Sequence, residues 1–130
     1  MSQENVEIVR RIYEAFNARD LARGLELIDL DFEWIPDKRD SAPAVRGREK
    51  VLRFLQDQIE VLGMKVELEE AFQKGDQVVA FICVRGEGQA SGVEIDIRVA
   101  SLWTFRDGTP VRGQAYAVRA EALEAAGLRE

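Results

Sequence analysis

An aspartate and an arginine lie two residues apart inside a stretch that reads as one long β-strand. Asp96 and Arg98 fall within residues 93–106, which are followed by the hairpin-turn signal Asp107-Gly108. An acid and a base on one face of a strand could transfer protons in an active site. The alternative is a solvent-facing ion pair, which contributes little to stability by itself.

The alternation of side chains along this strand favours the ion pair. Successive side chains point to opposite faces, so Asp96 and Arg98 share one face. The other face is apolar with a single hydroxyl and consists of Val93, Ile95, Ile97, Val99, Ser101, Trp103 and Phe105. We therefore expect the apolar face to line a cavity and the charged pair to lie outside, unless a β-bulge inverts the alternation.

A second candidate for acid–base chemistry is a carboxylate in the polar loop PDKRDSAPAVRG. Asp37 follows Pro36 and lies close to Trp34 in the sequence. Apolar surroundings raise the pKa of a carboxylate, which would suit a general acid or base. The sequence favours the other interpretation, an exposed turn residue among charges.

Few other residues of the chain could do chemistry. Tyr13 and Tyr116 are typical of core aromatics whose hydroxyl is hydrogen-bonded, and either could assist as a proton donor. Arg85 and Glu87 lie beside glycines, which indicates charges at the end of a hairpin. The chain has no histidine and one cysteine, so histidine triads, histidine zinc sites and thiolate clusters are excluded. We expect no metal site and no cofactor.

Composition places the chain among ordinary globular domains. It has 130 residues, of which 46% are apolar and 32% charged, with a net charge of −6. Its 18 basic residues are scattered among 24 acids, so neither nucleic acid nor an anionic membrane is expected as a partner. No apolar run approaches the ~20 residues that span a bilayer. The polar N-terminal sequence is no secretory signal, which predicts a cytoplasmic protein.

These groups must be positioned by helices and strands. The spacing of apolar residues changes from helical to alternating near residue 63, which separates the two kinds of element. Helices are expected over residues 3–18, after Asp20 and over residues 48–62. An antiparallel meander with a short final helix should follow, with strands at 64–72, 78–85, 93–106 and 110–116 and the helix at 119–127. This order indicates an α+β fold with helices packed on one face of a sheet.

One strand of this meander also suggests a partner. Residues 78–85, VVAFICVR, are apolar on both faces, so something other than the chain's own helices should cover one of them. We therefore expect a homodimer through the outer face of the sheet.

Three stretches of the sequence are similar to a known superfamily. VRRIYEAFNARD, VRGREKVLRFL and WTFRDGTPVRGQAY resemble the nuclear transport factor 2-like superfamily in its SnoaL-like branch, which is related to ketosteroid isomerase and limonene epoxide hydrolase. The resemblance implies that residues 1–130 form a single SnoaL-like domain. It implies a cone-shaped fold, in which three N-terminal helices wrap a strongly curved, mainly antiparallel sheet and a short C-terminal helix follows. It also implies an apolar pocket at the open end, and homodimers that pair through the sheet.

The resemblance also indicates which residues could act. It places the general base of ketosteroid isomerase near Asp37, its oxyanion-hole tyrosine at Ile12 rather than Tyr13, and its second aspartate at or near Ser101. No relative's full catalytic set is present. The resulting prediction is a SnoaL-like protein that binds a small apolar ligand, with its specific role unassigned. The expected pocket residues are Tyr13, Phe16, Trp34, Val99, Ser101, Trp103 and Tyr116. The alternative is a cofactor-free acid–base enzyme, isomerase-like, polyketide cyclase-like or epoxide hydrolase-like, with Asp37 as its catalytic residue.

Overall fold

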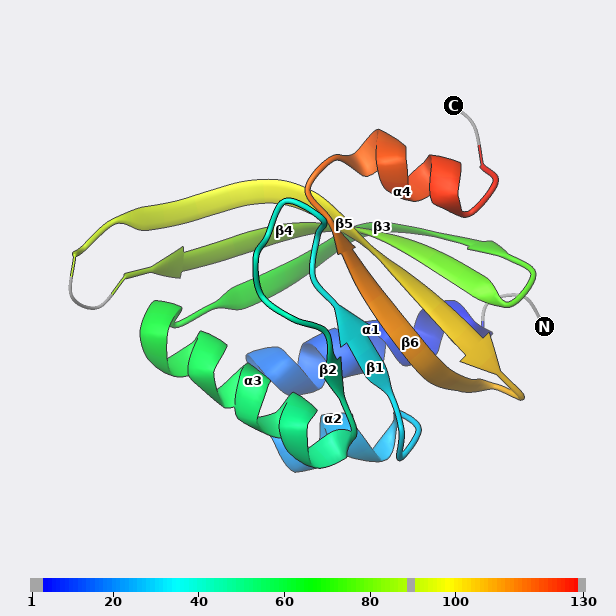
Figure 1. Ribbon diagram of the computed structural model, residues 1–130, viewed down its shortest axis with the longest axis horizontal. Helices are drawn as coiled ribbons and strands as arrows, with labels where there is room; N and C mark the ends of the chain where they lie inside the picture. Colours follow the sequence, from blue (N-terminus) through cyan, green and yellow to red (C-terminus); the bar gives the residue numbers. More distant parts are fainter. Residues whose placement is uncertain (1–3, 89–90, 129–130) are drawn as a thin grey trace.

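The computed structural model describes residues 4–88 and 91–128 (Figure 1). Within these residues it contains four helices and six strands. In chain order they are α1 (Glu4–Asn17), α2 (Leu21–Glu26), β1 (Glu33–Ile35), β2 (Val45–Arg46), α3 (Arg48–Leu62), β3 (Lys65–Lys74), β4 (Gln77–Glu87), β5 (Glu94–Arg106), β6 (Thr109–Tyr116) and α4 (Arg119–Ala125). The expected order of the helices and of the four later strands is confirmed, whereas Val45–Arg46, expected within a polar loop, form β2 and pair with β1.

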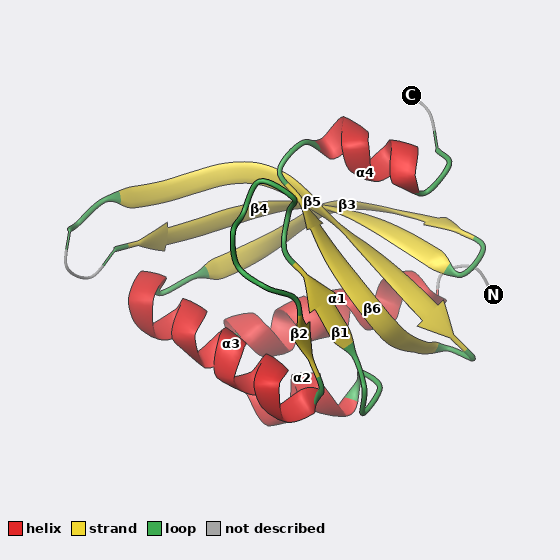
Figure 2. Cartoon of the chain, viewed as in Figure 1, coloured by secondary structure: helices red, strands yellow, loops and turns green. Residues whose placement is uncertain are grey.

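The strands form one strongly curved sheet in the order β2-β1-β6-β5-β4-β3. β1 and β6 run parallel, and the other neighbouring strands pair antiparallel. α1, α2 and α3 lie against the concave face, whereas α4 lies on the opposite face (Figure 2). The sheet does not close on itself, since β2 and β3 remain as its edges. The α+β cone predicted from the sequence is confirmed.

The local sequence explains where the helices begin and end and which side of α1 is buried. The buried stripe of α1 is the predicted one, Val6, Val9, Tyr13 and Phe16. Asp20 caps α2, because its carboxylate accepts a hydrogen bond from the backbone N–H of Arg23. α3 ends at Gly63, whose φ of 56° is left-handed and free of strain only for glycine. In the part of the chain that the structure describes, no helix has the length and apolarity needed to cross a membrane.

The long strand β5 keeps the alternation that the sequence predicts. Its pairing with β4 is continuous over residues 94–104, so no bulge inverts its faces there. Ser101 and Trp103 are 1% and 3% exposed on the concave face. The side chains of Asp96 and Arg98 are 70% and 72% exposed on the other face. The charged pair therefore lies outside the cone, as predicted.

Two apolar clusters lie on opposite faces of the sheet. The larger fills the space between the concave face and the first three helices, with Val9, Phe16, Phe32, Val51, Val78 and Trp103 among its buried members. The smaller lies beneath α4 and is built from Val79, Ala100, Leu102, Ala122 and Ala126. Each buried methylene in such a cluster contributes roughly 0.8 kcal/mol, which holds α4 on the sheet.

The second cluster corrects one expectation. The apolar outer face of residues 78–85 does not depend on another chain for its cover. Ala122 and Ala126 bury Val79, and Leu123 packs with Phe72 and Phe81 against the same cluster. The sequence predicted the C-terminal helix but not its place, because a short Ala- and Glu-rich helix has no strong apolar stripe to aim it.

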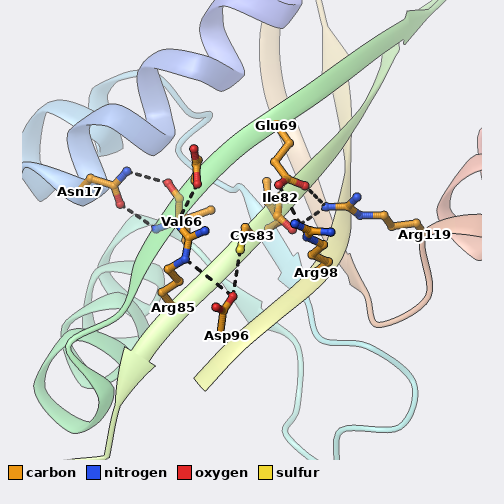
Figure 3. Close-up of polar contacts among 10 residues, drawn as sticks. Asn17, Val66, Glu69, Ile82, Cys83, Arg85, Asp96, Arg98 and Arg119 are labelled. Carbon is orange, nitrogen blue, oxygen red and sulfur yellow. Dashed lines mark hydrogen bonds and ion pairs between the residues drawn. The ribbon is translucent and has the colours of Figure 1, made fainter. Parts of the chain in front are cut away.

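The free edge of β3 is partly covered by the end of α1. The amide of Asn17 donates from Nδ2 to the carbonyl oxygen of Val66 at 2.7 Å, and its Oδ1 accepts from the Val66 N–H at 2.9 Å (Figure 3). Arg19 donates from Nη1 to the carbonyl oxygen of Met64 at 2.7 Å. The pairing with β4 shifts register between Leu68 and Glu70, which marks a β-bulge.

Candidate functional site

A cavity of about 610 Å³ lies between the concave face of the sheet and α1, α2 and α3. Most of its lining is aliphatic or aromatic, as is typical of small-ligand sites. All seven residues expected to form a pocket line it: Tyr13, Phe16, Trp34, Val99, Ser101, Trp103 and Tyr116. Their role in binding a ligand stays a prediction. α3 adds Phe54, Leu55 and Gln58, which the sequence analysis did not name.

Three side chains form a buried polar cluster in the wall of this cavity. The hydroxyl oxygens of Tyr13 and Ser101 are 2.7 Å apart and share a hydrogen bond. The indole N–H of Trp103 donates to Ser101 Oγ at 2.8 Å. Tyr13 comes from α1 and the other two from β5, where their spacing of two residues puts both on the concave face. The rings of Tyr13 and Trp103 meet edge to face, 5.8 Å apart.

The tyrosine of this cluster stays protonated over the physiological pH range. Burial raises the pKa of Tyr13 to about 12, although the hydrogen bond with Ser101 and the nearby Trp103 N–H act to lower it. A neutral phenol is a hydrogen-bond donor and not a base. The cluster can therefore offer a hydrogen-bond donor to a molecule in the cavity.

Aromatic rings continue the cavity wall beside the cluster. The rings of Phe32 and Trp34 lie 5.7 Å and 5.9 Å from that of Trp103. The Trp34 ring packs directly on the backbone of Gly113 in β6, where a Cβ atom would come within 2.7 Å of it. Glycine at position 113 therefore fixes how far Trp34 stands from the sheet.

Asp37 lines the cavity from the loop between β1 and β2 and is held firmly by hydrogen bonds. Its carboxylate accepts from the backbone N–H of Ala117 at 2.7 Å, from the backbone N–H of Arg39 at 2.9 Å and from Arg39 Nη1 at 3.0 Å. Burial acts to raise the pKa of Asp37, but these hydrogen bonds and the Arg39 charge together lower it. The expectation of a raised pKa is wrong.

Asp37 is a turn residue whose side chain is largely buried. It is a turn residue, since its own carbonyl accepts from the Asp40 N–H at 2.8 Å. It is not an exposed one, because its side chain is 13% exposed. A carboxylate with a lowered pKa is a weak base, so the geometry favours a structural role. General acid–base catalysis by Asp37 stays a prediction that no observation tests.

Arg39 joins this loop to the last helix. Its Nη2 donates to Glu121 Oε2 in α4 at 2.7 Å, while its Nη1 contacts Asp37. Tyr116 stands beside this contact at the end of β6 and packs against the cluster under α4. Burial, together with the charges of Glu121 and Asp37, raises the pKa of Tyr116. The contacts of Arg39 with Asp37 and Glu121 thus fix the loop at the edge of the cavity.

The charged residues on the outer face form ion pairs among themselves (Figure 3). Arg85 pairs with Glu67 at 2.7 Å and approaches Asp96 at 3.7 Å, and Arg98 lies 3.8 Å from Glu69. None of these five lines the cavity. Their arrangement matches the solvent-facing interpretation of the Asp96–Arg98 pair.

Sequence analysis missed one residue on this face. Arg119, the first residue of α4, donates to the backbone carbonyls of Val99 and Ile82 at 3.0 Å each, and to Glu69 at 2.6 Å. Its guanidinium also lies over the Phe81 ring, 4.7 Å from the centroid. These partners are scattered over three strands, so no spacing in the sequence could indicate them.

Comparison with known proteins gives the family. The sequence model of the SnoaL-like domain matches residues 9–113, most of the chain. The chain belongs to the SnoaL-like family. The resemblance inferred from the sequence is therefore confirmed. No curated protein matches this SnoaL-like chain in sequence.

Solved structures share the SnoaL-like fold over nearly their whole length. A nuclear transport factor 2-like protein of unknown function from Burkholderia pseudomallei is 24% identical, with a TM-score of 0.80, and the match covers 95% of this chain and 97% of that one. A putative SnoaL-like polyketide cyclase from Jannaschia is 26% identical, with a TM-score of 0.76 and coverages of 89% and 86%. A Mycobacterium tuberculosis protein in complex with estradiol-17β-hemisuccinate is 19% identical, with a TM-score of 0.77 and coverages of 87% and 92%.

Proposed function

We propose that this SnoaL-like protein binds one small apolar molecule in the cavity between its first three helices and its sheet. The observation that carries the proposal is the cavity itself, which is apolar, about 610 Å³ in volume and served by one buried polar cluster. Cavities of several hundred Å³ with few polar groups are typical of small-ligand sites. The similar fold from M. tuberculosis, crystallised with a steroid ester, supports the same class of ligand.

Intrinsic fluorescence tests this function directly. Trp34 and Trp103 are the chain's two tryptophans, and both line the cavity. Steroid-like or polyketide-like compounds that enter should change the emission of one or both indoles. An emission spectrum that stays the same across a broad panel of such compounds would contradict the proposal.

A substitution that fills the cavity should weaken ligand binding. Leu55→Trp places an indole in the lining of α3, and we expect it to weaken binding of N-phenyl-1-naphthylamine, an apolar fluorescent probe, by about tenfold or more. The matched control is Gln56→Trp, one residue along the same helix on its exposed side. Equal probe affinity in the two variants would show that the probe binds elsewhere.

The proposed homodimer is expected to use the part of the outer face that α4 leaves open. This area has charges of both signs, Glu67, Arg85, Asp96 and Arg98, so a second copy can set acids against bases. Such contacts are screened at about 1 M salt, where the Debye length is about 3 Å. Light scattering should show a dimer at low salt that dissociates at high salt. A monomer at micromolar concentration in low salt would contradict the dimer.

A further inference from the structure

The loop between β1 and β2 forms part of the cavity wall without belonging to the core. Four of its residues line the cavity: Pro36, Asp37, Asp40 and Ala42. Residues 38–44 are all exposed to solvent, and in the part of the chain that the structure describes none of them belongs to either apolar cluster. A segment with few buried apolar contacts opens at a lower free energy than the packed core. We therefore expect this loop to open while the sheet and helices stay folded.

Both ends of the loop are fixed to the sheet. At one end the Asp37 carboxylate accepts from the Ala117 N–H at 2.7 Å, and at the other Val45 pairs with Trp34 of β1. Between these ends, and among the described residues, the backbone of residues 38–44 makes hydrogen bonds only within the loop. These seven residues can thus swing about two fixed points.

One side-chain contact holds the middle of the loop against the last helix. Arg39 and Glu121 form a two-pronged ion pair, with Nη1 donating to Oε1 at 3.2 Å and Nη2 to Oε2 at 2.7 Å. α4 itself is fixed, because Ala122 and Ala126 are buried on the sheet. In Figure 1 the loop between β1 and β2 rises toward the start of α4. The ion pair therefore joins a segment that can move to a helix that cannot.

The ion pair is placed to act as a latch and not as a binding group. The side chains of Arg39 and Glu121 are 47% and 30% exposed, so water reaches the pair and its opening costs little. Neither residue lines the cavity. A change at either one should therefore alter how the loop moves without removing a contact to a bound molecule.

We propose that residues 38–44 are a lid over the cavity, latched to α4 by the Arg39–Glu121 ion pair, and that this latch sets how fast a ligand enters and leaves. The proposal rests on the ligand-binding function and adds how its site opens. A closed lid blocks entry and exit alike. Weakening the latch should then raise both rate constants by the same factor and leave the affinity unchanged, whereas losing a contact to the ligand would change the affinity.

Stopped-flow fluorescence with N-phenyl-1-naphthylamine measures both rate constants. Glu121→Gln removes the charge and keeps the size of the side chain. Its association and dissociation rate constants should each rise about threefold, as expected for the loss of a partly exposed ion pair, with an unchanged Kd. Arg39→Gln should have the same effect, and adding Glu121→Gln to it should change little more, because both substitutions remove one contact.

Glu124→Gln is the matched control. It removes the same charge from the exposed side of the same helix and does not touch the contact with Arg39. Both rate constants of this variant should equal those of the wild-type protein.

The outcomes separate the lid from the binding function. Rate constants that Glu121→Gln leaves unchanged, or that Glu124→Gln raises equally, overturn the lid. A change in only one rate constant, and so in Kd, overturns it as well. The binding function stands in these cases because the probe still binds. A wild-type protein that does not bind the probe overturns that function and the lid with it. If circular dichroism shows that Glu121→Gln does not fold, Arg39→Gln decides by the same criteria.

Discussion

Replacing Gly113 by alanine should destabilise the protein by about 2 kcal/mol and displace Trp34 from the cavity wall. A Cβ atom at this position would lie 2.7 Å and 2.8 Å from two ring carbons of Trp34 and 3.0 Å from the ring of Phe32. Both rings must therefore shift, and because they are closely packed against their neighbours, the shift strains the contacts around them. Overpacking of this kind typically costs 1–3 kcal/mol. Urea unfolding measures the loss, and the emission of Trp34 reports the displacement.

Gly24 offers a matched control for this substitution. A Cβ atom there would meet Ala15 Cβ at 3.5 Å, an ordinary contact, and the residue lies in α2. Gly24→Ala should therefore be neutral or stabilise the protein by up to about 1 kcal/mol, since alanine is the better helix former. Equal stability of the two variants would show that the Trp34 contact is looser than described.

Removing the Asp37 carboxylate is the second substitution with a large expected effect. Asp37→Ala should lower the free energy of unfolding by about 2 kcal/mol at neutral pH, because it leaves the Ala117 N–H without its acceptor and removes one of the two carboxylates that Arg39 contacts. Asp40→Ala is the matched control in the same loop. Asp40 is exposed, and among the residues that the structure describes its carboxylate accepts only from the nearby Ala42 N–H, so little change is expected.

The loss of stability expected for Asp37→Ala should depend on pH in a defined direction. The folded protein lowers the pKa of Asp37, so the ionised carboxylate is more favourable in the folded state than in the unfolded one. Its contribution is complete above the pKa of an unfolded aspartate, about 3.9, and is lost as pH falls through the lower folded value. The stability difference between the wild-type protein and Asp37→Ala should therefore shrink in acid. A difference that grows as pH falls would contradict the assignment.

Periodicity explains why the fold could be predicted. The apolar stripe of α1 and the alternation of β5 are local patterns. Each shows which side of its own element is buried, without reference to any partner. Together they set the curved sheet against the helices and turned Ser101 and Trp103 inward. The same alternation puts Asp96 and Arg98 on the outer face, where the structure has them.

Contacts between distant residues explain what could not be predicted. The hydrogen bond between Tyr13 and Ser101 joins residues 88 positions apart, and that between Asp37 and Ala117 spans 80 positions. The second contact reversed the expected pKa shift, because Trp34 is near Asp37 in the sequence but Arg39 and a backbone N–H determine its environment. Sequence patterns predict which face a residue occupies more readily than which partner it meets there.

The contact between Asn17 and Val66 has a consequence for how this protein behaves at high concentration. An open sheet exposes unpaired backbone groups at its edges, where identical chains can join edge to edge and aggregate. Here one amide side chain takes both the N–H and the carbonyl that β3 would offer at Val66, and the bulge before Glu70 disturbs the edge further along. At the opposite edge, β2 is only two residues long. Both edges of the open sheet are thus protected against edge-to-edge growth into a fibre.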